Sequence, residues 1–239
     1  MSLAGFAEDV YKTLKHTVVF GSSRAAHYFW HMNDYLNWGE PWYGGFRESQ
    51  SDYRIDNQEY YEDNYMPNML GWFLITSQTN PEDVDWMLAR AAGYNAGYAL
   101  VVRYDAIKNN PFINEIVEQV NSWTEAQQKK AFSPAQKQWL RMPEHDVHLE
   151  RDAVNAWKMY RYKKIIFEHA AKILQPGEPT SSEWNFENNT GSQNAQLVLL
   201  AVGNIGEISN PVIELDNSLR IQIPLNLKAG QSLVIDNSA

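Results

Sequence analysis

The stretch that decides the fold reads MLGWFLI at residues 69–75, NPEDVDWMLARAAG at 80–93 and GYALVV at 97–102. The first and last pieces are apolar runs without alternation, which is typical of strands buried on both faces of a parallel sheet. The middle piece begins with an asparagine cap, a proline at the first helical position and acids in the first turn. Strand, helix and strand in about 35 residues predict a right-handed βαβ unit with adjacent parallel strands.

Upstream of this unit the sequence predicts one more strand and one more helix. Residues 17–20 are a short run rich in β-branched side chains that stops at Gly21. Residues 24–37 follow a serine cap and carry apolar side chains at helical spacing. Residues 39–67 form a long irregular stretch, and loops of this length in compact domains are often functional.

Downstream, two more helices begin with a capping residue followed by proline. Asn110-Pro111 opens one with a regular apolar stripe, and Ser133-Pro134 opens a short one. Together with the upstream pattern, they predict a β/α segment over residues 4–142.

The pattern changes at about residue 145, where short β-branched or aromatic segments follow one another. The predicted strands are 146–150, 154–162, 164–171, 183–187, 195–202, 212–215, 219–223 and 232–235. A helix near 167–174 is an alternative, because Glu168 to Lys172 have fair helix propensity. Several short strands at regular spacing predict an antiparallel sandwich over residues 145–239.

The composition narrows the classes of function. The chain has 239 residues, a net charge of −9 and no cysteine. An acidic surface repels phosphate backbones, so no nucleic-acid partner is expected. No apolar run reaches the roughly 18 residues of a membrane span, and thiolate metal sites are excluded. Nine Trp, thirteen Tyr and nine Phe are an excess that fits either core packing or stacking on sugar rings.

Three stretches carry a resemblance: MPNMLGWF at 66–73, PEDVDWMLAR at 81–90 and AGYAL at 96–100. They resemble the closing part of a (β/α)₈ barrel in large bacterial glycoside-hydrolase-like proteins, where a β-sandwich follows the barrel. GEISNP at 206–211 and IPLNLKAGQ at 223–231 resemble a galactose-binding-like sandwich. The resemblance implies a carbohydrate-active protein that hydrolyses O-glycosyl bonds. It also implies a carbohydrate partner, and a periplasmic or secreted parent protein.

The predicted fold class is therefore multi-domain α/β plus all-β. A partial (β/α) barrel-like segment is followed by an antiparallel β-sandwich. Three strands cannot close a barrel, and a predicted strand reaches almost to the last residue. We therefore expect a fragment of a longer protein, with a truncated sandwich, that packs against parts missing from this chain.

The candidate catalytic residues lie where barrel chemistry sits, at the carboxyl ends of strands. The predicted strand ends are 22–24, 76–78 and 103–105, and Asp105 is the carboxylate nearest to one of them. Glycoside hydrolysis needs two carboxylates, so the partner would come from the loop at 39–67. Glu40 is preferred there, and the alternatives are Glu48, Asp56, Glu59, Glu62 and Asp63.

Aromatic residues around Glu40 could stack a sugar and raise the pKa of the acid by desolvation. The predicted substrate-binding residues are Trp38, Trp42, Tyr43, Arg103 and Ser22. The competing explanation is a solvated loop acid, with an Asp105 that caps a helix or pairs with Arg103.

Neither a metal nor a cofactor is expected. His27, His31 and Asp34 share a helix face without the glutamate motif of zinc proteases, and an ordinary polar face explains them. His145 and His148 would point to opposite faces of a strand, so they should not share a ligand. Glycine-rich nucleotide motifs and a serine-hydrolase elbow are absent from the sequence.

Three hypotheses follow: a glycoside hydrolase fragment, a non-catalytic carbohydrate-binding module, or a structural piece without activity. A convergent pair of acids at strand ends would favour the first over the second. A large exposed apolar face beside the strands would favour the third.

Overall fold

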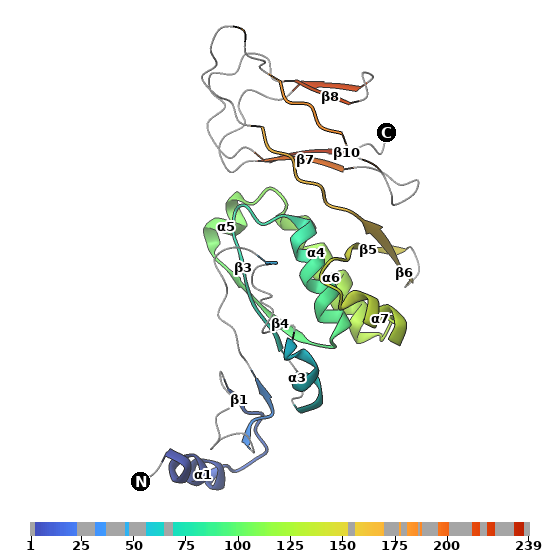
Figure 1. Cartoon of the computed structure of the whole chain (residues 1–239). Coiled ribbons are helices and arrows are strands. Elements are labelled where there is room, and N and C mark those ends of the chain that lie inside the picture. Colours follow the sequence, from blue (N-terminus) through green and yellow to red (C-terminus); the bar gives the residue numbers. More distant parts are fainter. Residues whose placement is uncertain are drawn as a thin grey trace.

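The computed structural model describes residues 3–22, 32–36, 46–47, 56–64, 69–152, 156–169, 177, 181–185, 187, 196–200, 212–215, 219–222 and 232–236. At its centre are β3 (Met69–Ile75), α4 (Pro81–Gly93) and β4 (Gly97–Val102). The strands β3 and β4 are adjacent and parallel, which confirms the predicted βαβ unit. The helix α4 lies against one face of the pair (Figure 1). It begins as predicted, because the Asn80 side chain accepts a hydrogen bond from the Asp83 backbone at 2.9 Å.

The two faces of the β3–β4 pair differ in their surroundings. Phe73 pairs with Leu100 and Ile75 with Val102, and both β3 residues are buried in the main core. Trp72 and Leu74 alternate with them and are half-buried. Gly71 has a φ of 144°, where the register shifts between Met69 and Gly71. Only glycine adopts such a backbone conformation without strain.

Three helices follow β4: α5 (Tyr104–Asn109), α6 (Ile113–Gln128) and α7 (Pro134–Leu140). The helix α7 confirms its predicted start, where Ser133 and Gln136 form a capping box. The helix α6 is present, but the predicted cap at Asn110 is wrong, because Phe112 is the N-cap residue and Asn110 ends α5. The short helix α5 was not predicted. The last turn of α4 packs closely on the end of α7. A Cβ added to Gly93 would lie 2.9 Å from the backbone nitrogen of Arg141.

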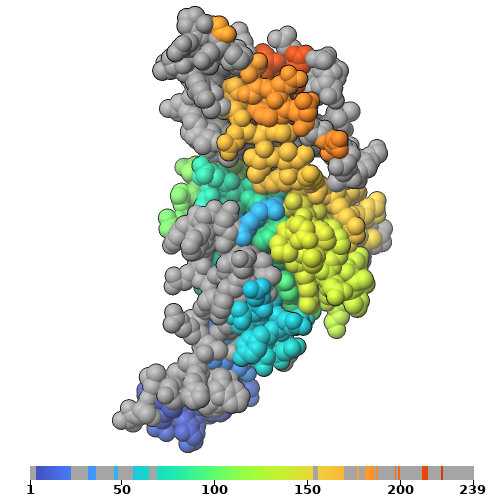
Figure 2. Space-filling model, viewed as in Figure 1, coloured from blue at the N-terminus to red at the C-terminus, as the bar shows by residue number. Residues whose placement is uncertain are grey.

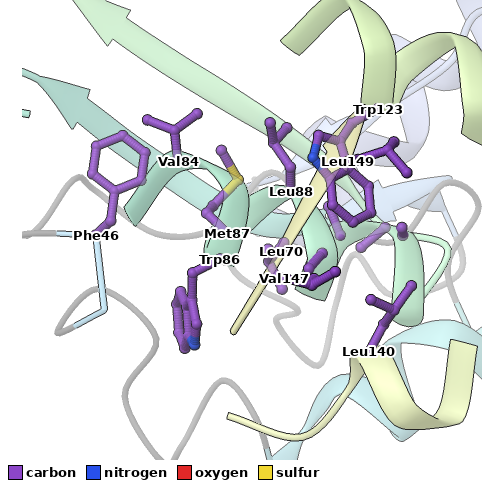
Figure 3. Packing of buried hydrophobic residues seen from close by; sticks show 14 of the residues in the cluster. Phe46, Leu70, Val84, Trp86, Met87, Leu88, Trp123, Leu140, Val147 and Leu149 are labelled. Carbon is purple, nitrogen blue, oxygen red and sulfur yellow. The ribbon is translucent and has the colours of Figure 1, made fainter. Parts of the chain in front are cut away.

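The strands β5 (Asp146–Asp152) and β6 (Ala156–Tyr162) form an antiparallel hairpin that packs on the helices. Val147 and Leu149 of β5 belong to the same buried cluster as Val84, Met87 and Trp123 (Figure 3). The surfaces of α7 and of the hairpin are continuous in the space-filling view (Figure 2). The predicted division at 142–145 thus falls between elements that share one core, and the division itself stays a prediction.

The N-terminal part corrects two predictions. It contains α1 (Leu3–Thr13), the parallel pair β1 (Gly21–Ser22) and β2 (Tyr35–Leu36), and α3 (Gln58–Asn64). The predicted strand at 17–20 is wrong, because regular pairing begins only at Gly21. The predicted helix at 24–37 is wrong at its end, because Tyr35 and Leu36 pair with β1 and cannot be helical. Most of its earlier residues lie outside the described ranges.

In the C-terminal part, four predicted strands are confirmed in position. These are β7 (Gln196–Leu200), β8 (Val212–Leu215), β9 (Leu219–Gln222) and β10 (Ser232–Asp236). The strand β7 pairs with β10 and β8 with β9, both antiparallel. The predicted strands at 164–171 and 183–187 are wrong wherever they are described, and residues 167–169 are not helical either.

Every sheet in the described part of the chain has two strands, and no closed barrel is found among them. The partial barrel and the sandwich stay predictions.

Candidate functional site

The carboxyl ends of β3 and β4 meet at one edge, because the two strands are parallel. We call the residues that follow them, Thr76 to Gln78 and Arg103 to Asp105, the strand-end edge. The side chain of Asn110 binds the part of this edge that follows β3. Its side-chain amide donates to the carbonyl oxygens of Thr76 and Thr79, both at 2.8 Å, and it is 4% exposed. The backbone of the edge after β3 is therefore held by a buried side chain.

The side chains that follow β4 are open to solvent. Arg103 is the N-cap residue of α5 and makes no side-chain cap bond. Tyr104 is 80% exposed, and Arg103 and Asp105 are exposed beside it. In the described structure Asp105 neither caps α5 nor pairs with Arg103. It lies in the first turn of α5, where an acid stabilises the start of a helix.

Of the other predicted site residues, Ser22 is described, and it does not lie at this edge. Ser22 lies in β1, which Figure 1 places beside α1 and away from α5. Glu40, Trp38, Trp42 and Tyr43 lie outside the described residues. Of the alternative acids, Glu62 lies on α3 and forms an ion pair with Arg141 at 2.8 Å. Asp56, Glu59 and Asp63 are exposed, and Glu48 lies outside the described residues.

A second cluster of polar side chains lies where α4, α6 and β5 meet. The carboxylate of Asp85 is 1% exposed and accepts hydrogen bonds from three side chains. Trp123 Nε1 donates at 2.7 Å, Gln119 Nε2 donates at 2.9 Å and His148 Nδ1 lies 2.6 Å away. We call these four residues the Asp85 junction.

The electrostatics of the junction favour a charged histidine. The hydrogen bond to Asp85 raises the pKa of His148, and burial only partly opposes this. Burial raises the pKa of Asp85, while its bonds from His148 and Trp123 act in the opposite sense. Burial also raises the pKa of Glu82 and of Glu115, which stand in the first turns of α4 and α6. The junction therefore holds an Asp85–His148 ion pair, with the carboxyl groups of Glu82 and Glu115 nearby.

Sequence reasoning missed the Asp85 junction, although α4 carries a signal for it. After its first turn this helix has only Asp85 and Arg90 as charged residues, and it lies between two apolar segments of the sequence, 69–75 and 97–102. A helix without a polar face must bury its charged side chains, and buried charges need partners. The two histidines were predicted to lie in one strand, but β5 begins at Asp146, so only His148 is part of it. His145 Nδ1 lies 2.8 Å from the Trp139 carbonyl oxygen, whereas His148 meets Asp85.

The described residues contain no group of three or more His, Asp or Glu side chains that could hold a metal ion. His27 and His31 lie outside them. No described helix has the length and apolar character needed to cross a membrane. No protein-family model, curated protein or solved structure matches the chain.

Proposed function

We propose that this chain belongs to a carbohydrate-active protein and that its strand-end edge binds a glycan. The observation that carries the proposal is the exposed run Arg103, Tyr104 and Asp105, directly after a strand of a parallel β/α unit. Ligands of barrels and of open α/β sheets bind at this end of the strands. The expected partner is a carbohydrate.

The chemistry of these three side chains suits a sugar. The exposed Tyr104 ring offers a flat apolar face for the C–H surface of a pyranose, and its hydroxyl can hydrogen-bond. The Arg103 guanidinium donates hydrogen bonds and the Asp105 carboxylate accepts them, which matches neighbouring sugar hydroxyls. The net charge of −9 favours a neutral glycan over an anionic one.

The fuller form of the proposal is a glycoside hydrolase whose parent protein is periplasmic or secreted. Hydrolysis would use Asp105 together with Glu40, one as acid and one as nucleophile or base. Trp38, Trp42 and Tyr43 would line the cleft around Glu40. The sequence alone supports the roles of Glu40 and of these three aromatic residues. Glycan binding at the strand-end edge is the part of the proposal that rests on the described geometry.

The first test is calorimetric titration with oligosaccharides chosen from a glycan array. We expect Tyr104→Ala to weaken binding by about tenfold, or about 1.4 kcal/mol, because the stacking surface is lost. Tyr60→Ala is the matched control, because Tyr60 is 53% exposed on α3, outside the strand-end edge. If the wild type binds no glycan, the proposal fails. Equal losses of glycan affinity in both variants would show that Tyr104 is not part of the binding site.

Turnover is tested separately, with aryl glycosides and with the glycan that binds. Glu40→Gln and Asp105→Asn should each lower the rate by several orders of magnitude if both act as catalytic carboxylates. Binding without any turnover in the wild type would favour the carbohydrate-binding module over the hydrolase.

A further inference from the structure

We propose that the Asp85–His148 pair is a pH-sensitive clasp that holds the β5–β6 hairpin on α4 and α6. This inference does not rest on the proposed glycan site. The two residues are 63 positions apart in the chain, and their contact of 2.6 Å joins α4 to β5. The His148 side chain is 34% exposed and that of Asp85 only 2%, so protons can reach the imidazole while the carboxylate stays fixed.

The geometry fixes how the imidazole is held. Trp123 and Gln119 of α6 hold the Asp85 carboxylate from one side, and His148 approaches from β5. The carboxylate accepts, so Nδ1 carries the proton that is donated to it. The other ring nitrogen, Nε2, lies 3.8 Å from Glu150 Oε1 and is the atom that gains or loses a proton.

The groups around His148 favour its protonated form from more than one element. Asp85 of α4 acts most strongly, and Glu150 of β5 and Glu115 of α6 act in the same direction. The other titratable side chains nearby are Glu82 of α4, and Tyr160 and Tyr162 of β6. In this arrangement a proton on His148 strengthens the contact between the hairpin and the helices.

Other bonds between α4 and the chain around the hairpin do not titrate in this range. Trp86 Nε1 donates to the Pro143 carbonyl oxygen at 2.7 Å. Arg90 donates to the carbonyl oxygens of Met142 and His145. These bonds anchor the start of the hairpin at any pH near neutrality. The Asp85–His148 pair is therefore the contact whose strength depends on pH.

The direction of the pH effect follows from the raised pKa of His148. Its contribution is fully present below the ordinary histidine pKa, about 6.5. It is lost as the pH rises through the higher pKa of the folded state. The hairpin should therefore be held more tightly in mild acid than in mild alkali.

Hydrogen exchange of backbone amides in the full chain tests the clasp. Protection factors, which correct for the intrinsic pH dependence of exchange, are compared between about pH 6 and about pH 8.5. For β5 and β6 amides of the wild type, we expect protection to be about threefold to tenfold higher at the lower pH. His148→Asn keeps an N–H donor near the place of Nδ1 and cannot titrate, so its protection should not change with pH.

His145→Asn is the matched control, because His145 contacts a carbonyl oxygen rather than a carboxylate. It should keep the pH dependence of the wild type. Circular dichroism establishes that each variant is folded. The proposal is overturned if wild-type hairpin protection is the same at both pH values, or if His148→Asn retains the dependence. An equal pH effect on β3 and β4 amides would also overturn it, because the effect would then be global.

Discussion

Asp85 and Asp105 each lie near the start of a helix, and their surroundings give them opposite roles. Asp85 is enclosed by three side-chain donors, whereas Asp105 faces solvent and makes no bond within the described structure. A buried carboxylate that has all its donors contributes to folding, and removing it leaves those donors unpaired. Asp105 stands in the first turn of α5, where an exposed acid adds only a small dipole contribution, so its carboxylate is available to a ligand.

Replacing each acid by alanine separates these roles. Asp85→Ala should lower the free energy of unfolding by roughly 3 kcal/mol, because it breaks a buried charged network. Asp105→Ala should change it by less than about 0.5 kcal/mol, as for most exposed positions. Urea denaturation measures both. Similar values for the two variants would show that the Asp85 network carries little of the stability.

At this scale the sequence predicts where a strand ends better than which side chains are buried. It placed Arg103 and Asp105 at a strand end because they directly follow an apolar run, and the strand does end there. It could not find the partner of Asp85, because His148 is 63 positions away and only the packed hairpin brings the two together. It also passed over Tyr104, because exposure of an aromatic ring depends on how the following residues turn into α5.

At the scale of elements, Asn110 links the end of β3 to the start of α6. Its amide nitrogen donates to Thr76 and Thr79, and its amide oxygen accepts from the Phe112 backbone at 2.8 Å. One short side chain thus satisfies three backbone groups from two distant parts of the chain. The sequence predicted Asn110 only as a helix start. An asparagine before a proline has the same local pattern whether it caps a helix or bonds to a distant loop.

Asn109 and Asn110 provide a comparison between neighbours. Asn110→Ala should destabilise the fold by about 2 kcal/mol, because it leaves buried backbone groups without partners. Asn109→Ala should have almost no effect, because Asn109 is exposed. Thermal unfolding followed by circular dichroism is the measurement. A small loss at Asn110 would mean that water replaces its amide.

At the scale of the molecule, the β5–β6 hairpin completes the core of the β/α part. Val147 and Leu149 join a cluster built from α4, α6 and α7. Arg47, far earlier in the chain, bridges Asp83 and Asp146 at 2.8 and 2.7 Å. A change in sequence pattern at residue 145 therefore marks a change of secondary structure more clearly than a change of folding unit.

Shortened chains test how far this unit extends. A chain that ends at residue 142 should lose cooperative unfolding and bind a hydrophobic dye, because Leu140 and Trp123 lose the strand that covers them. A chain that ends at residue 169 should unfold cooperatively, because it keeps the hairpin. If the shorter chain unfolds as cooperatively as the longer one, residues 4–142 are a domain by themselves.

The elements that the sequence predicted depend on signals from neighbouring residues, whereas the elements that it missed depend on contacts with distant ones. The unit at 69–102 follows from contiguous signals, namely two apolar runs and a capped helix, so its pairing could be predicted. The strand β2 lies in a stretch whose apolar residues at helical spacing predicted a helix instead, and β1 lies just after the predicted strand at 17–20. Two-residue strands of this kind depend on their partners, and no local pattern specifies them.

The indole rings of α4 and α6 have an optical consequence. Trp86 donates to a carbonyl oxygen just before the hairpin and lies near the guanidinium groups of Arg47 and Arg90, at 5.3 and 5.0 Å from the ring centre. Trp123 donates to Asp85 and stacks on Phe132. Both rings therefore sense a charged neighbour that comes from a different element. The fluorescence emission and near-ultraviolet circular dichroism of these two tryptophans should change when the hairpin detaches. Detachment of the hairpin should therefore be measurable without an added probe.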